Sequence, residues 1–333
     1  MRLFKRLGID LGTSNTVIWT EGEGIVLNES TMVAVALEDK QLLAAGEEAK
    51  KMSGKTPDYI EVIRPMNEGV VADFEVTVAM MRYFLRKVMG KLWMFGPEVL
   101  VSVPSGATEV ELRAVIDAIL AAGARKVNLI DEPLAAAIGA KIPIAESFGN
   151  MVVSVGGGST EVAVIALGGV VAHSSIRVGG DRIDEAIVSY LRKKHNLLVG
   201  EQTAEAIKIK LGSAVKLKRP ETMEVSGRDV VNGLPKNEVV DSDGVYEAIL
   251  GVLEVIVGAV RQTLEVTPPE LVSDVADRGI VLCGGSVQLR GFDTLMTREI
   301  GVSTHVVSEP QMAVIRGVGM AVENLEIYRQ ALR

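Results

Sequence analysis

The sequence predicts an α/β protein of two lobes. Strand-like runs alternate with longer helical stretches, which is the pattern of α/β proteins. The chain has 333 residues, more than a single core usually organises. Two segments of similar composition, Ile9–Thr16 and Val153–Thr160, each run from an apolar strand through a turn of glycines and hydroxyls into a second apolar strand. These three observations together predict the fold class.

Each of the two segments predicts a tight hairpin whose turn can face an anion. Glycine accepts backbone angles that other residues avoid and leaves no side chain in the way, so successive N–H groups can converge on one phosphate. Hairpins also use these residues for shape alone, and one copy by itself leaves both interpretations open. The pair favours a polyphosphate between two halves. When the copies are aligned, Ser154 stands opposite Asp10, a hydroxyl in place of a carboxylate.

The other elements follow from local patterns in chain order. Pro133 comes directly after Glu132 and starts a small-residue helix, whereas Gly123 ends the helix before it. Between residues 216 and 240, charge, glycine and proline indicate a loop-rich or small β region. We expect strands at 99–103, 127–130, within 149–175 and at 279–283, and helices at 109–122, 134–140, 181–195 and 247–264. Lobe I is expected at residues 1–140 and lobe II at 141–333, with insertions at about 32–75 and 183–245.

Composition excludes several classes of protein. The formal net charge of −8 argues against a general nucleic-acid-binding surface. A single cysteine, Cys283, excludes an internal disulfide and fits a reducing cytosol. No apolar run approaches the roughly 18–20 residues that span a bilayer, and the N-terminus lacks the apolar core of a signal peptide. We therefore expect a soluble protein, or one attached to a membrane only at its surface.

Two familiar nucleotide-binding motifs are not supported. No G-x-G-x-x-G leads from a strand into a helix, as a Rossmann site requires. Gly54, Lys55 and Thr56 imitate the end of a P-loop, but Ala49 stands where that motif needs its first glycine. The two hairpins therefore indicate a phosphate-binding architecture that is neither a Rossmann site nor a P-loop.

Motifs spread in order along the whole chain resemble the MreB family of bacterial actin-like filament proteins. The strings are Gly8–Thr16, Val103–Gly106, Asp131–Gly139, Gly156–Val164, Thr203–Lys208, Pro268–Leu271 and Asp277–Leu282. The glycine turns alone would indicate only the wider superfamily of actins, sugar kinases and heat-shock ATPases, whereas several of the other strings are peculiar to this family. The resemblance implies an actin-like ATPase fold: two lobes, each with a ribonuclease-H-like core, and a nucleotide cleft between them. Subdomain IB would be the insertion at 32–75, and subdomain IIB the insertion at 183–245.

The resemblance also implies ATP and Mg²⁺ in the cleft. Asp10 would hold the metal through water, because Mg²⁺ keeps much of its hydration shell. Glu132 would orient or deprotonate the attacking water, and Ser159 would help to place it. Without the family, the favoured interpretation of Glu132 is a carboxylate stabilised at a helix N-terminus. Glu205 would contact the ribose, Lys208 the base, and the backbone of Gly284, Gly285 and Ser286 the nucleoside as a whole. The phosphates would be contacted from both lobes, by Gly12, Thr13, Ser14 and Asn15 on one side and by Gly156, Gly157, Gly158, Ser159 and Thr160 on the other.

Ser154 departs from the family pattern, which places an aspartate there facing Mg²⁺ and the attacking water. Loss of an outer-shell carboxylate typically costs about 10–100-fold in metal affinity or activity. Nucleotide binding should survive this change better than hydrolysis does. We therefore expect ATPase activity that is slow or absent, unless Glu132 activates the attacking water without a second carboxylate.

A second candidate site is the apolar stretch Leu92, Trp93, Met94 and Phe95, which lies between Gly90 and Gly96. Such a loop can fold back onto the core, but Arg86, Lys87 and Lys91 surround it with cations, each worth about 1 kcal/mol near anionic lipid. The family carries a membrane-inserting loop at the matching place.

The resemblance implies filaments on the inner face of the cytoplasmic membrane that organise cell-wall synthesis and so set rod shape. The partners would be further copies of the chain, the membrane surface, the adaptor RodZ and the wall-elongation machinery. The alternative is a small-molecule kinase or another ATPase of the same superfamily.

Overall fold

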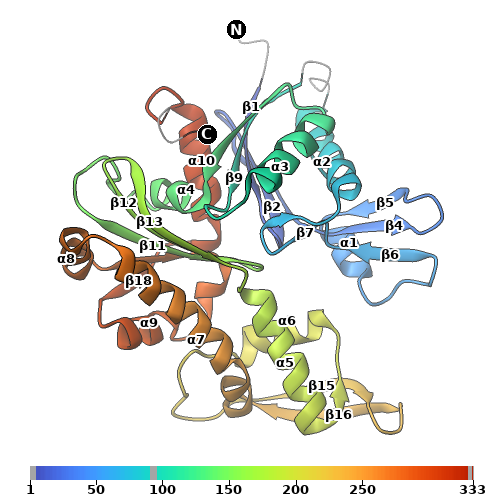
Figure 1. Ribbon diagram of the computed structural model, residues 1–333. Coiled ribbons are helices and arrows are strands. Elements are labelled where there is room, and N and C mark those ends of the chain that lie inside the picture. Colours follow the sequence, from blue (N-terminus) through green and yellow to red (C-terminus); the bar gives the residue numbers. More distant parts are fainter. Residues whose placement is uncertain (1–4, 91–95, 329–331, 333) are drawn as a thin grey trace.

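Two five-stranded sheets of the same design form the molecule. The computed structural model describes residues 5–90, 96–328 and 332 (Figure 1). The first sheet has the strand order β10-β9-β1-β2-β3, and the second has β13-β12-β11-β17-β18. In each sheet three strands in sequence pair antiparallel, a later strand lies parallel to the first of them, and a further strand lies parallel to that one. This duplication matches the pair of ribonuclease-H-like cores that the family resemblance implies.

The first sheet is built around the first glycine hairpin. Strands β1 and β2 pair antiparallel with Ile9 opposite Ile18, and β9 lies parallel to β1 with Ser102 opposite Asp10. The strands are β1 (Arg6–Leu11), β2 (Asn15–Thr20), β3 (Gly24–Ser30), β9 (Glu98–Val103) and β10 (Lys126–Asp131). The strands predicted at 99–103 and 127–130 are confirmed.

The second sheet contains the second glycine hairpin. All residues of β11 and β12 are buried, as expected of strands covered on both faces. In this hairpin Ser154 lies opposite Glu161, and on the other side of β11 it lies beside Cys283 of β17. The strands are β11 (Asn150–Val155), β12 (Thr160–Ala166), β13 (Gly169–Ile176), β17 (Ile280–Cys283) and β18 (Thr304–Val306).

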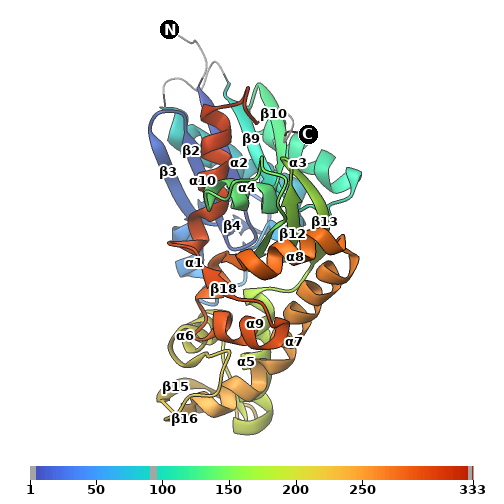
Figure 2. The ribbon, with the colours of Figure 1, turned by 90° about the vertical axis from the view of Figure 1, so that its left-hand side faces the viewer.

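Two helices, α4 (Glu132–Gly139) and α10 (Ala313–Glu323), lie side by side between the sheets (Figures 1 and 2). They approach so closely that a Cβ atom on Gly139 would overlap the carbonyl oxygen of Ala313, and one on Gly317 would overlap that of Ala135. Their side chains share one buried cluster with residues of both sheets. The predicted lobe boundary near residue 140 stays a prediction, because α10 comes from the end of the chain yet packs on β1, β2 and β9.

Further helices cover the remaining faces. Asp73 caps α2 through the amide of Val76, and Thr108 with Glu111 forms a capping box on α3. Among the described residues, no helix combines the length and apolarity needed to cross a bilayer. The helices are α2 (Phe74–Met89), α3 (Glu109–Ala121), α5 (Gly180–His195), α7 (Ser242–Val266), α8 (Pro269–Arg278) and α9 (Phe292–Ile300).

Two small sheets extend from the large ones. Sheet β5-β4-β6 packs with α1, and sheet β14-β15-β16 packs with α6. The β15–β16 hairpin is the small β region predicted between residues 216 and 240. The elements are β4 (Val33–Ala36), β5 (Leu42–Ala45), α1 (Glu47–Met52), β6 (Ile60–Ile63), β14 (Leu197–Leu198), α6 (Glu201–Leu211), β15 (Thr222–Asp229) and β16 (Pro235–Asp241).

Candidate functional site

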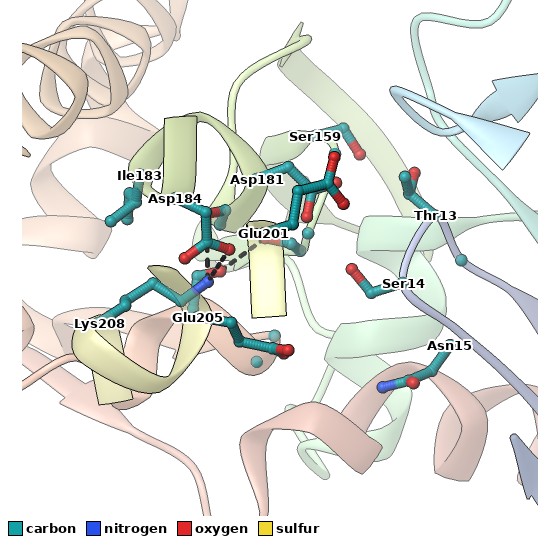
Figure 3. A pocket seen from close by; sticks show the side chains of 18 of the residues that line it. Thr13, Ser14, Asn15, Ser159, Asp181, Ile183, Asp184, Glu201, Glu205 and Lys208 are labelled. Carbon is teal, nitrogen blue, oxygen red and sulfur yellow. Dashed lines mark hydrogen bonds and ion pairs between the residues drawn. The ribbon is translucent and has the colours of Figure 1, made fainter. Parts of the chain in front are cut away.

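A cavity of about 1070 Å³ lies where the two glycine turns meet. Its walls come from both turns, from helices α1, α5 and α6, and from the short 3₁₀ helix η2 (Gly285–Gln288). Figure 3 shows Thr13, Ser14 and Asn15 on one side of the pocket and Asp184, Glu205 and Lys208 on the opposite side. Residues from positions 10 to 314 therefore contribute to one space.

The two turns have the same construction. The amide of Gly12 donates to the carbonyl of Asn15 at 3.0 Å, and the amide of Gly156 donates to that of Ser159 at 2.9 Å. The turns touch tip to tip, because a Cβ atom on Gly157 would overlap Ser14 Oγ and one on Gly158 would lie 2.5 Å from Thr13 Oγ1. Any larger residue at Gly157 or Gly158 would have to displace these side chains.

Asp10 stands at the end of β1, directly before the first turn. Ser102 Oγ of the neighbouring strand β9 donates to Asp10 Oδ1 at 2.9 Å. Burial raises the pKa of Asp10 to about 6, and the Ser102 hydrogen bond opposes this shift. A cation at this position would favour the charged form of the carboxyl group.

Glu132 is the first residue of α4 and meets Ser154 across the cavity floor. Ser154 Oγ donates to Glu132 Oε1 at 3.0 Å, and the Ser154 side chain is almost fully buried. Burial raises the pKa of Glu132 well above its usual range, and the nearby carboxyl groups of Glu161 and Asp10 raise it further. The Ser154 hydrogen bond is too weak to cancel these effects.

Glu161 is a buried carboxyl group that the sequence analysis did not identify. It lies on β12, where Ser175 Oγ of β13 donates to Oε1 and the amide of Ser105 donates to Oε2 at 3.1 Å. Burial raises the pKa of Glu161 to about 7. The signal in the sequence is a single acidic residue at the start of an apolar strand. Because Ser105 follows β9 of the first sheet, Glu161 joins the two sheets beneath the cavity.

The far end of the cavity contains the residues predicted to meet ribose and base. Lys208 Nζ lies 2.6 Å from Asp184 Oδ2 and donates to the carbonyl of Gly180 at 3.2 Å, as the dashed lines in Figure 3 show. Glu205 Oε2 lies 2.9 Å from Nζ of Lys50, which comes from α1 on the other side of the cavity. Burial opposes ionisation of Glu205, but the Lys50 contact brings its pKa below the usual range.

The cavity brings together nearly all of the predicted site residues. Asp10, Glu132, Ser154, both turns, Glu205, Lys208 and Gly284–Ser286 line it. Thr160 is the exception and does not line the cavity. Its hydroxyl is buried in the second sheet and donates to the carbonyl of Val178 at 2.6 Å. Ser286 Oγ supports the second turn by donating to the carbonyl of Gly156 at 2.7 Å. Lys50 and Arg64, which also line the cavity, were not predicted.

The predicted membrane loop, Leu92, Trp93, Met94 and Phe95, lies outside the described residues. One of the cations expected beside it has an internal partner. Lys87 Nζ lies 2.7 Å from Glu29 Oε1 on β3, and this contact raises the pKa of Lys87. The charge of Lys87 is therefore partly neutralised within the protein.

Two ribonuclease-H-like sheets, with a cavity between them lined by a glycine turn from each, define an actin-like protein. The comparisons with known proteins agree. The MreB/Mbl protein family model matches residues 4–330. The chain belongs to the MreB/Mbl family.

Three relatives show how close this membership is. The chain is 48% identical over 327 residues to the cell shape-determining protein MreB of Escherichia coli strain K12, covering 97% of this chain and 94% of the relative. It is 44% identical over 320 residues to the cell shape-determining protein Mbl of Bacillus subtilis strain 168, covering 96% of each. Its fold matches the crystal structure of MreB 5 of Spiroplasma citri bound to AMPPNP with a TM-score of 0.93, 32% identity and 99% coverage of both chains.

Proposed function

We propose that this protein binds ATP between its two glycine turns and polymerises into filaments. The observation that carries the proposal is the meeting of the two turns, distant in sequence, at one cavity. The Spiroplasma citri relative bound to AMPPNP supports a triphosphate as the ligand. The phosphates would lie between Gly12–Asn15 and Gly156–Ser159, and the nucleoside would extend toward Glu205 and Lys208. The two lobes would comprise residues 1–140 and 141–333.

Mg²⁺ fits the residues at the cavity floor if the nucleotide supplies part of the coordination. Among the described residues, no cluster of three or more histidine, cysteine or acidic side chains could hold a metal by itself. Mg²⁺ usually binds through one or two carboxylates, waters and substrate phosphates, so a full protein cage is not needed. Asp10 would hold the ion through water. The bound ion would neutralise charge on the phosphates.

Hydrolysis should be weak. Glu132 would orient the attacking water and accept its proton, with Ser159 helping to place that water. In the nucleotide-free protein, burial and the neighbouring carboxyl groups raise the pKa of Glu132, which disfavours the charged form that acts as a base. Ser154 offers a hydroxyl where the family has a carboxylate, and this hydroxyl already donates to Glu132. We therefore expect binding and assembly without rapid turnover.

The filaments would lie on the inner face of the cytoplasmic membrane and organise cell-wall synthesis, with RodZ and the elongation machinery as partners. The cell shape-determining relatives support this role. Attachment would use Leu92–Phe95. A single loop binds a bilayer weakly, but a filament presents many loops, and their combined binding is far tighter. Assembly and membrane attachment should therefore reinforce each other.

Calorimetry followed by sedimentation tests the proposal. The protein should release or absorb heat on titration with Mg²⁺ and ATP, and should pellet with ATP as filaments that are visible by electron microscopy. Absence of any binding heat would refute the nucleotide site. Binding without filaments, together with phosphate transfer to a small molecule, would indicate the kinase alternative.

Liposome flotation tests membrane attachment. Trp93→Ser should leave the protein at the bottom of the gradient, because the loop loses its largest apolar side chain. Tyr59→Ser is a matched control, since Tyr59 is 69% exposed on a different loop. Equal flotation of the two variants would reject the loop as the membrane contact.

A further inference from the structure

A buried serine supports Asp10 from the neighbouring strand. Ser102 lies on β9 opposite Asp10 of β1, and its Oγ donates to Asp10 Oδ1 at 2.9 Å. Only 7% of Ser102 is exposed, and both residues line the cavity. The hydroxyl therefore contacts the carboxylate proposed to hold the ion, from a strand that carries none of the predicted site residues.

The strand that carries Ser102 is otherwise apolar and buried. The other residues of β9 that follow Glu98 are valines and a leucine, and all of them are buried. A buried hydroxyl without a hydrogen-bond partner is costly, and so is a buried carboxylate without a donor. Ser102 and Asp10 satisfy each other, so loss of the serine hydroxyl would leave the carboxylate with one donor fewer.

The second sheet shows that a serine is not needed at this position to build the strand. Strands β11 and β17 repeat the arrangement of β1 and β9, with Ser154 in place of Asp10 and Cys283 in place of Ser102. Cys283 is fully buried, and its thiol donates to the carbonyl of Val153 at 3.6 Å. A thiol is a weak donor and a hydroxyl is a good one. The good donor therefore stands in the half of the molecule that has the carboxylate.

We propose that Ser102 is a positioning residue for Asp10, whose carboxylate it fixes so that Asp10 holds Mg²⁺ through water when a nucleotide is bound. This inference rests on the proposed function. A carboxylate has two oxygens that accept hydrogen bonds, so Oδ1 can stay with Ser102 while Oδ2 accepts from a water on the ion. Removal of a group that hydrogen-bonds to a metal-holding side chain typically costs about 10–100-fold in metal affinity.

A positioning role and a purely structural role predict different results. If the Ser102 hydroxyl serves only the packing of the first sheet, its loss weakens nucleotide binding to the same degree with and without metal. If the hydroxyl positions Asp10, its loss weakens only the part of nucleotide binding that depends on Mg²⁺. The two roles are therefore separated by measuring nucleotide affinity in the presence and in the absence of the ion.

Calorimetric titration with AMPPNP, once with Mg²⁺ and once in EDTA, tests the inference. Wild type should bind AMPPNP more tightly with Mg²⁺, and Ser102→Ala should lower this gain about tenfold while its affinity in EDTA equals that of wild type. Ser102→Cys should lower the gain similarly, because the thiol is a weak donor. The fold accepts a buried cysteine at the corresponding position of the second sheet, so this variant guards against misfolding.

Ser175→Ala is the matched control. It also removes a hydroxyl that donates to a buried carboxyl group, but that group is Glu161, which is not proposed to hold the ion. Its gain from Mg²⁺ should equal that of wild type. A double-mutant cycle then identifies the route of the effect. The double variant Asp10→Ala, Ser102→Ala should lose no more of the gain than Asp10→Ala alone, because Ser102 acts through Asp10.

Three results would overturn the inference while leaving nucleotide binding intact. They are an equal loss of affinity with Mg²⁺ and in EDTA for Ser102→Ala, a loss of the gain in Ser175→Ala that matches it, and additive losses in the double variant. Failure of wild type to bind AMPPNP in either buffer would instead overturn the proposed function.

Discussion

Replacement of Ser154 by aspartate should restore hydrolysis at the expense of stability in the nucleotide-free protein. Ser154 Oγ lies 3.0 Å from Glu132 Oε1, and an aspartate oxygen would lie about as close. Two full charges at this separation repel by roughly 5 kcal/mol at an effective dielectric constant of about 20. The pair avoids most of this cost by sharing one proton. The melting temperature of the nucleotide-free variant should therefore fall as the pH rises above the ordinary carboxyl pKa of about 4.

Binding of Mg²⁺ and ATP should favour the ionised form of the two carboxyl groups over the form that shares a proton. The metal stabilises the ionised carboxylates, so phosphate release by Ser154→Asp should exceed that of wild type by about 10–100-fold. Ser154→Asn has the same shape without the charge and should stay at the wild-type rate. The assay is phosphate release at saturating ATP, with circular dichroism to show that each variant is folded. Equal and rapid release by wild type and both variants would refute the reasoning.

Three further predictions concern stability and nucleotide exchange. Burial raises the pKa of Glu161 from 4.5 to about 7, so the folded protein keeps a proton that the unfolded chain releases. The unfolding free energy should therefore fall by up to about 3 kcal/mol as the pH rises through this range. In urea titrations, Glu161→Gln should flatten this decline. Gly317→Ala should lower the unfolding free energy by about 1–3 kcal/mol or more, because its Cβ would overlap an α4 carbonyl, whereas Gly251→Ala, which has open space, should not be destabilising. Lys50→Met breaks the ion pair with Glu205 of α6 across the cavity and should speed the release of a fluorescent ADP several-fold in stopped-flow experiments. The exposed control Lys51→Met should release it at the wild-type rate.

Most of the fold could be predicted because its signals are local. Both glycine hairpins combine apolar strands with small turn residues, and the helix at Asp181–His195 is strongly amphipathic. Helix α10 was not predicted, although Arg316, Met320 and Glu323, its residues that are not buried, lie on one face and the rest of the helix is buried between the two sheets. Its place on the first sheet depends on contacts with residues some 300 positions earlier in the chain, which no local pattern reveals.

The candidate site was predictable in its turns and less so in the groups that support them. Asp10, Glu132 and Ser154 could be identified because they stand beside the turns or in family motifs. Ser102 could not, since a serine inside a strand gives no sign that its hydroxyl will face Asp10 on the neighbouring strand. Lys50 was missed for a similar reason. Its partner Glu205 lies more than 100 residues away and meets it only in the folded protein.

The position of α10 has a consequence for how the protein is made. The last strand of the first sheet ends at Asp131, yet α10, which packs on the inner face of that sheet, spans Ala313–Glu323. On the ribosome, nearly 200 residues must be added before that apolar face is covered. During this interval the nascent chain exposes the apolar side chains of Val17 and Leu100, which α10 later helps to bury, so chaperones that hold apolar segments can bind it.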